Sequence, residues 1–194
     1  TEDLGYSAFF LADHFLSLGP ALAPTFHPPQ LLGAVPAIAM ALEQTKTLRV
    51  GCRVFCNDYR HPFVLAKEAA TLDYLSGGRL EFGIGAGWLA NEYAAVGLPF
   101  DDFAARFARL GEFVHAYKAF MSGEPLALDG DCIQWSGFHG TPAPVQRPWP
   151  PLMIGGGSRR ILEFAGAEAD IVSLNFNNRA GVCLLYTSPS PRDR

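Results

Sequence analysis

The chain has 194 residues, of which 49% are hydrophobic and 18% charged, and its formal net charge at pH 7 is -4. This composition is typical of a core-forming globular protein and unlike that of a disordered chain. The sequence has no basic cluster for nucleic acid and no apolar run long enough to span a membrane. We therefore expect a cytoplasmic protein that acts on a small-molecule substrate.

The cysteine pattern points to no metal centre and no disulfide framework. Cys52, Cys56, Cys132 and Cys183 form no CxxC pair and have no metal-ligand spacing. Reduced thiols in a cytoplasmic protein are the ordinary interpretation, so no metal site is predicted.

The first half of the chain alternates strand-like and helix-like segments. Residues 6–12 predict a short apolar strand, and residues 36–45 predict a helix that Pro36 opens. Between them, residues 15–35 form a long Pro-rich loop of the kind that often covers a binding site. Residues 48–55 predict a second strand, and residues 62–75 a helix with Pro62 in its first turn.

The second half continues the alternation. Residues 79–93 (RLEFGIGAGWLANEY) form an apolar strand that runs through glycines into a helical segment. Asp102 is the expected cap of a long amphipathic helix, whose apolar stripe predicts core residues. Four further segments are expected: an excursion over 124–150 with a hairpin near 133–135, a strand over 151–154, a helix over 158–168 and a strand over 170–174.

Three strand–glycine–helix units in one chain predict a parallel sheet, because parallel strands need helical crossovers. At least five parallel strands are expected, which fits either a (β/α)8 barrel cut at both ends or an open doubly wound sheet. A complete barrel needs about 250 residues, more than this chain has. In both folds, functional groups gather where strands end and helices begin.

The glycines at these strand ends have two interpretations. Gly83, Gly85 and Gly87 expose backbone N–H groups that suit an anion or a polar ring edge, and a missing Cβ permits close approach of a ligand. Alternatively, they form ordinary tight turns.

With the strands in place, six sequence motifs follow one another in order: Leu11–His14, Arg60–Pro62, Ala66–Asp73, Leu75–Arg79, Gly83–Trp88 and Ile154–Gly157. Together they resemble the bacterial-luciferase-like monooxygenase superfamily, and in particular its coenzyme F420-dependent oxidoreductase branch. The resemblance implies an α/β TIM barrel in which residues 1–181 hold strands two to six, without the first and the last two. Residues 182–194 resemble adapter read-through and are expected to be non-native.

The resemblance also implies site residues. His14 would be the catalytic proton-transfer group, although the residue alone fits a histidine that packs or caps a strand end better. Arg53 and Val54 would form a bulge, often with a non-proline cis peptide, behind the cofactor ring. Cys56 would contact the ring or be a small buried thiol. The cofactor-binding set implied in this way is Asp13, Arg53, Val54, Cys56, Ala86, Gly87, Asn91, Gly155, Gly156, Gly157 and Ser158.

The expected activity is hydride transfer between coenzyme F420 and a small organic substrate. Two alternatives stay open: an FMN-dependent monooxygenase that uses O2, and a non-catalytic cofactor-binding scaffold. Sugar-phosphate dehydrogenases of the family carry a catalytic Glu where this chain has Trp88, which argues against that substrate class. Relatives commonly form homodimers, so a homodimer also stays open. The isolated chain, with open sheet edges, is expected to be inactive.

Overall fold

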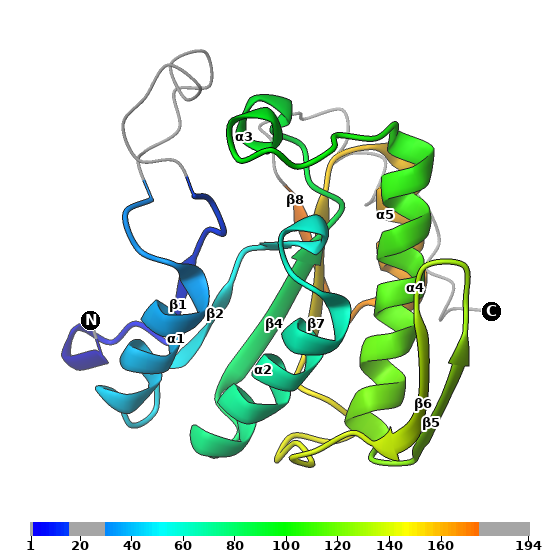
Figure 1. The fold of residues 1–194 in the computed structure, drawn as a ribbon. Helices are drawn as coiled ribbons and strands as arrows, with labels where there is room; N and C mark the ends of the chain where they lie inside the picture. The colour runs from blue at the N-terminus through cyan, green and yellow to red at the C-terminus, as the bar shows by residue number, and fades with distance from the viewer. Residues whose placement is uncertain (1, 16–29, 175–194) are drawn as a thin grey trace.

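The computed structural model describes residues 2–15 and 30–174, which form a curled parallel sheet with helices packed along it (Figure 1). The strands run in the order β1-β2-β4-β7-β8, and β3 pairs with β4. Because this order never reverses, the sheet is part of a (β/α)8 barrel and not a doubly wound sheet. The strands of the sheet are β1 (Ala8–Leu11), β2 (Arg49–Cys52), β3 (Phe55–Cys56), β4 (Leu80–Gly85), β7 (Leu152–Gly156) and β8 (Ile171–Leu174).

The helices follow the expected ends. Pro62 opens α2 in its first turn, and the side chain of Asp102 caps α4 by accepting a 2.8 Å bond from the Ala105 N–H. A 3-10 turn at Glu2–Leu4 precedes the first strand, and the helix expected from Pro36 starts two residues earlier, at Ala34. The helices are η1 (Glu2–Leu4), α1 (Ala34–Glu43), η2 (Asn57–Tyr59), α2 (Pro62–Leu75), α3 (Ala90–Ala95), α4 (Phe103–Ser122) and α5 (Arg159–Glu168).

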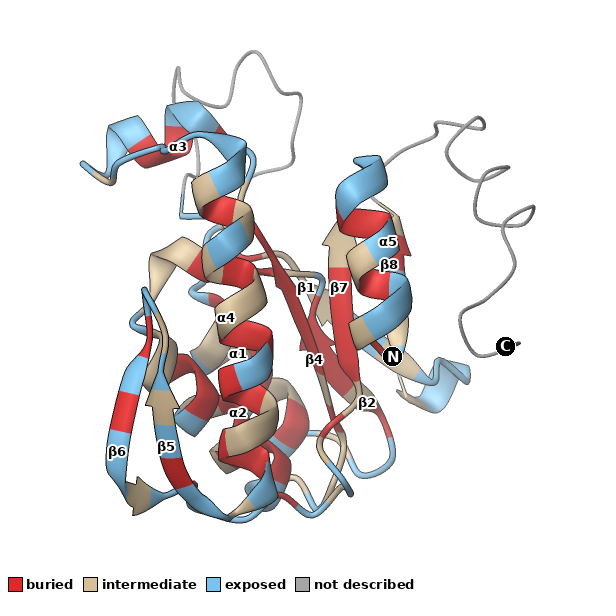
Figure 2. Cartoon of the chain, turned by 90° about the vertical axis from the view of Figure 1, so that its right-hand side faces the viewer, coloured by how far each residue is buried: buried red, intermediate tan, exposed pale blue. Residues whose placement is uncertain are grey.

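The core lies between the sheet and its helices. Phe82 of β4 stacks on Tyr117 of α4 with the ring centroids 4.6 Å apart, and both side chains are fully buried. Figure 2 shows the buried positions gathered on β4, on β7 and on the sides of the helices that face them. Since side chains alternate along a strand, Gly83 and Gly85, the neighbours of Phe82 and Ile84, face the opposite, inner side of the sheet.

The strand predicted over residues 48–55 is interrupted. β2 pairs with β4 up to Gly51, opposite Glu81, and pairing resumes at Phe55, opposite Ile84. Between these two pairs, the chain from β2 to β3 uses one residue more than β4 does, which is a bulge. The peptide bond between Arg53 and Val54 is cis, so the structure has the bulge and the bond type that the family resemblance implied.

A two-stranded hairpin stands beside the sheet, next to α4 (Figure 1). β5 (Pro125–Asp129) and β6 (Gln134–His139) pair antiparallel, which confirms the expected hairpin, although Gln134 and Trp135 belong to its second strand. Trp135 is buried and packs edge-to-face against Phe63 of α2 at 5.5 Å between centroids. The hairpin therefore covers the helical layer rather than the sheet.

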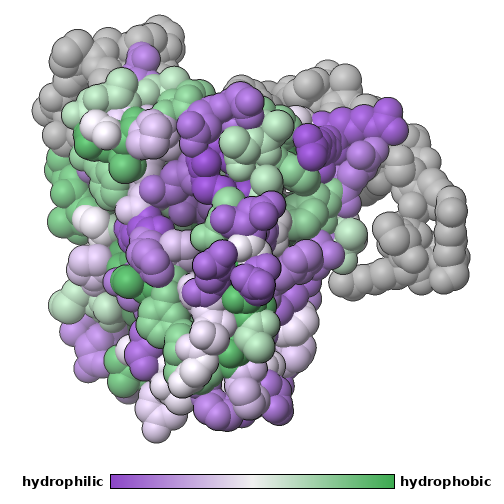
Figure 3. Space-filling view, turned by 45° about the vertical axis from the view of Figure 1, so that its right-hand side comes forward, coloured by the Kyte–Doolittle hydropathy of each residue, from purple (hydrophilic) through white to green (hydrophobic). Residues whose placement is uncertain are grey.

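On the face seen in Figure 3, hydrophilic and hydrophobic side chains are interspersed. Among the described residues, none of the helices combines the length and the apolar character that a membrane crossing requires. Most of the loop predicted over 15–35, and the whole tail predicted over 182–194, lie outside the described residues.

Candidate functional site

A cavity of about 360 Å³ opens at the carboxyl ends of the parallel strands. Its size lies within the usual range for small-ligand sites. Asn91, on α3, is exposed and does not line the cavity, although it belonged to the predicted set. The other eleven predicted site residues all line it: Asp13, His14, Arg53, Val54, Cys56, Ala86, Gly87, Gly155, Gly156, Gly157 and Ser158.

Val54 forms the floor of this cavity and rests on three glycines. A Cβ at Gly155 would stand 2.9 Å from both methyl groups of Val54, and a Cβ at Gly85 would stand 2.9 Å from one of them. A Cβ at Gly83 would collide with the backbone carbonyl of Cys52 and lie 3.0 Å from Val54. These strand glycines therefore make room for a protein side chain, a role that neither of the two interpretations of Gly83 and Gly85 included.

Two further glycines at the cavity also serve the protein's own packing. Gly87 has a φ of 76°, and a Cβ there would collide with the hydroxyl of Tyr93. A Cβ at Gly156 would stand 2.5 Å from a methyl group of Ile161, so this glycine lets α5 approach the end of β7. The strand-end glycines set the distances between the elements around the cavity.

His14, in the segment after β1, is held by a buried carboxylate. Its Nδ1 lies 2.7 Å from Oε2 of Glu92, whose side chain is fully buried. The same oxygen accepts a 2.5 Å bond from the hydroxyl of Tyr59, and Oε1 accepts a 2.6 Å bond from the Phe15 N–H. Burial raises the pKa of Glu92, but these hydrogen bonds outweigh it and hold the pKa below its ordinary value.

Asp13 has a different environment from that of its neighbour. Its carboxylate forms a bidentate pair with Arg60, at 2.7 and 2.8 Å, and accepts a 3.0 Å bond from the Cys56 N–H. Three of the roughly four acceptor positions of a carboxylate are thus used within the protein. Asp13 lines the cavity, but its contacts fix the segment after β1 to β3.

The Cys56 thiol faces the cavity in an unreactive state. Its Sγ lies 2.9 Å from the hydroxyl of Tyr93, and burial raises the pKa of the thiol to about 12. A protonated thiol is a weak nucleophile, so Cys56 can contact a ligand without reacting with it.

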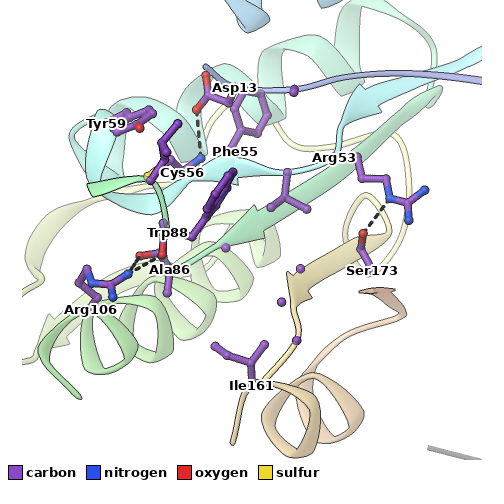
Figure 4. A pocket seen from close by; sticks show the side chains of 18 of the residues that line it. Asp13, Arg53, Phe55, Cys56, Tyr59, Ala86, Trp88, Arg106, Ile161 and Ser173 are labelled. Atoms are coloured by element: carbon purple, nitrogen blue, oxygen red, sulfur yellow. Dashed lines mark hydrogen bonds between the residues drawn. The ribbon is translucent and has the colours of Figure 1, made fainter. Parts of the chain in front are cut away.

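Two arginines face the cavity from opposite sides (Figure 4). Arg53 donates a 2.8 Å bond to Oγ of Ser173, and Arg106, only 8% exposed, donates to the carbonyls of Ala86 and Gly87. Among residues 2–15 and 30–174, no carboxylate pairs with either guanidinium. The two positive charges are therefore available to an anionic ligand.

The first turn of α5 closes another side of the cavity. Ser158 caps the helix by accepting a 3.3 Å bond from the Ile161 N–H, and Gly155–Gly157 lead into it. The positive end of a helix preceded by glycines is suited to a phosphate group. Arg159, which follows the cap, pairs with Glu163 and does not line the cavity.

Aromatic residues form the mouth of the cavity. Trp88 is 46% exposed and meets the ring of His14 edge-on, with centroids 6.0 Å apart. Phe103, predicted as part of the α4 core stripe, is 37% exposed and lines the cavity instead, because it lies at the helix end beyond the sheet.

Sequence reasoning missed Arg106, Tyr59 and the role of Glu92. One signal was present: Arg106 lies three residues after Phe103 and four before Leu110, so its charge falls on the apolar face of α4. The roles of Tyr59 and Glu92 depend on contacts across 33 and 78 residues of sequence, which no local pattern encodes.

Similar proteins place this geometry in a family. A curated relative, the FMNH(2)-dependent dimethylsulfone monooxygenase of Pseudomonas putida, is 31% identical over 121 residues, or 62% of this chain and 33% of the relative. An F420-dependent glucose-6-phosphate dehydrogenase of Amycolatopsis mediterranei is 31% identical over 170 residues, or 87% and 49%. A solved F420-dependent secondary alcohol dehydrogenase, in complex with an F420-acetone adduct, superposes with a TM-score of 0.75 at 23% identity, covering 89% of this chain and 50% of that one.

The chain thus spans half or less of the length of these relatives. The model of the luciferase-like monooxygenase family matches residues 1–182, nearly the whole chain. The chain therefore belongs to the luciferase-like monooxygenase family, and its relatives include members of the F420-dependent branch.

Proposed function

We propose that this chain carries the cofactor-binding part of an oxidoreductase that transfers hydride between coenzyme F420 and a small organic substrate. One observation supports this most: His14 and two arginines without carboxylate partners among the described residues face one cavity at the strand ends. An apolar floor at Val54, between positive groups on both sides, suits a cofactor that joins an aromatic ring to an anionic tail.

The protein's own groups would orient that cofactor and manage protons. Val54 would support the ring, and Arg53, Arg106 and the first turn of α5 would bind anionic groups. His14 would exchange a proton with the substrate, as an imidazole can near neutral pH. When bound, the deazaflavin supplies the hydride chemistry itself.

The substrate class follows from the cavity mouth. Trp88 cannot exchange a proton and presents an apolar surface beside His14. An uncharged substrate that carries a hydroxyl or carbonyl group fits this wall better than a sugar phosphate, although one relative is a glucose-6-phosphate dehydrogenase.

The experiment is a pair of cofactor titrations with the full-length protein, one with F420 and one with FMN, followed by turnover with secondary alcohols and with glucose 6-phosphate. We expect F420 binding and reduction of F420 by an alcohol. Binding of FMN without binding of F420 would favour the monooxygenase alternative, which the dimethylsulfone monooxygenase relative supports. Absence of binding with either cofactor would contradict both.

A further inference from the structure

Glu92 stands at the centre of a small buried network that joins three elements of the site. It belongs to α3, while its partners come from the segment after β1 and from η2. Both side-chain partners, His14 and Tyr59, line the cavity, whereas Glu92 itself does not. A fully buried carboxylate that binds two polar side chains of one cavity is placed to orient both.

We propose that Glu92 is the positioning residue of this site: its carboxylate fixes the ring orientation and the tautomer of His14 and holds Tyr59 beside it. This inference rests on the proposed function only for its effect on turnover. An ionised carboxylate accepts hydrogen bonds and donates none, so the hydrogen between Oε2 and the ring belongs to Nδ1. In the neutral ring, the acceptor nitrogen is then Nε2.

The charge on Glu92 has clear support in its surroundings. Among the described residues, the groups that bond its carboxylate are His14, the Tyr59 hydroxyl and the Phe15 N–H, and all three can donate to it. Burial, and then the bond to Glu92, raise the pKa of Tyr59 above its ordinary value, so its hydroxyl stays protonated as a donor. Glu92 is therefore a fixed acceptor for both cavity side chains.

The consequence for chemistry is a defined proton path. In the oxidation of a substrate hydroxyl, a bound deazaflavin would supply the hydride-accepting chemistry, and Nε2 of His14 would accept the O–H proton as the carbonyl forms. The resulting imidazolium is stabilised by the carboxylate 2.7 Å from Nδ1. Glu92 acts through His14 and does not touch the reacting atoms.

The test compares full-length wild type with Glu92→Gln, an isosteric change whose amide can donate to Nδ1. The first readout, 15N NMR of the His14 ring, needs no turnover. We expect the Nδ1–H tautomer in wild type and a shift toward Nε2–H in Glu92→Gln. The second readout is kinetic: kcat should fall at least about 100-fold, with KM changed less than about threefold.

Tyr59→Phe is the matched control, because it removes the other bond to the same oxygen. It should keep the Nδ1–H tautomer and lower kcat less than about tenfold. An Nε2–H tautomer in wild type would overturn the proposal, even if Glu92→Gln does not fold. A loss of stability in Glu92→Gln with an unchanged tautomer would overturn it as well. Wild-type protein with the expected tautomer but no hydride transfer would contradict the proposed function alone.

Discussion

The two ends of the parallel sheet are built on opposite principles. At the amino ends of the strands, polar groups complete one another: Arg49 pairs with Glu81 at 2.6 Å and bonds Gln146 at 2.9 Å. Asp73, fully buried, accepts bonds from the Val145 N–H and from both the backbone and the side chain of Gln146. At this end, charged groups meet partners within the protein.

At the carboxyl ends, Asp13 pairs with Arg60 and Glu92 with His14, but two further positive charges and a cavity are left over. Arg53 and Arg106 bond only to a hydroxyl and to carbonyls among the described residues, and glycines replace side chains around Val54. We therefore expect the amino ends of the strands to contribute mainly to stability and the carboxyl ends mainly to binding. Substitutions at the amino ends should destabilise the protein, whereas substitutions at the carboxyl ends should weaken cofactor binding.

Asp73→Ala should have the largest effect, on stability alone. It leaves three partly buried donors without their charged acceptor, so we expect the free energy of unfolding to fall by about 3 kcal/mol. Urea unfolding of the full-length protein measures this loss. Cofactor affinity, titrated under conditions where the variant is folded, should stay within a factor of about two of wild type. A large loss of affinity would break the division between the two ends.

Gly155→Ala should destabilise the protein by about 2 kcal/mol, because its Cβ meets both methyl groups of Val54. Val54→Ala in the same molecule should recover most of that loss, and a double-mutant cycle measures the coupling.

Gly83→Ala provides the contrast for this pair. Its Cβ would also collide with the Cys52 carbonyl, so Val54→Ala should recover little of the loss. If Val54→Ala recovered the same share of the lost stability at both glycines, contact with Val54 would not explain the effect of Gly155→Ala.

Arg53→Met should weaken cofactor binding about tenfold with little change in stability, since its bonds lie at the open end of the site. The affinity of wild type should also depend more strongly on salt than that of the variant. Arg159→Met is the control: this exposed arginine is next to the site in sequence but pairs with Glu163 and does not line the cavity. If both variants lose affinity equally, the loss comes from the general change in charge and not from a direct contact of Arg53 with the cofactor.

The smallest expected effect is local and lies at the amino-end side. Glu2 accepts bonds from the side chain and backbone of Thr47 and from the backbone of Lys46 and Leu48, which lower its pKa from 4.5 to about 2. A lowered pKa means that this stabilisation is complete above pH 4.5 and is lost as the pH falls toward 2. Amide-exchange protection of Thr47 should therefore drop in that window in wild type. In Glu2→Gln the same protection should be low and independent of pH.

Local signals predicted much of the fold. Pro62 and the Asp102 cap gave α2 and α4, because such signals act within one helical turn. The residues around the cavity were predicted mainly through the family resemblance. The packing of Gly83 and Gly85 against Val54 was not predicted, because a sequence shows that a Cβ is missing but not which atom occupies its place. Glu92 and Tyr59 were missed because their partnership arises only after folding.

Val54, between β2 and β3, packs against Gly83 and Gly85 of β4 and Gly155 of β7. We therefore expect the residues at these four positions to vary together among homologues. A homologue that gains a methyl group at Gly85 or Gly155 has to carry a smaller residue 54 or a lower surface under the ring, whereas a methyl group at Gly83 would still meet the Cys52 carbonyl. The residues at these positions would then predict, from the sequence of a family member alone, how deep its pocket is. The same coupling gives protein engineers a way to adjust that depth without touching any group that handles protons.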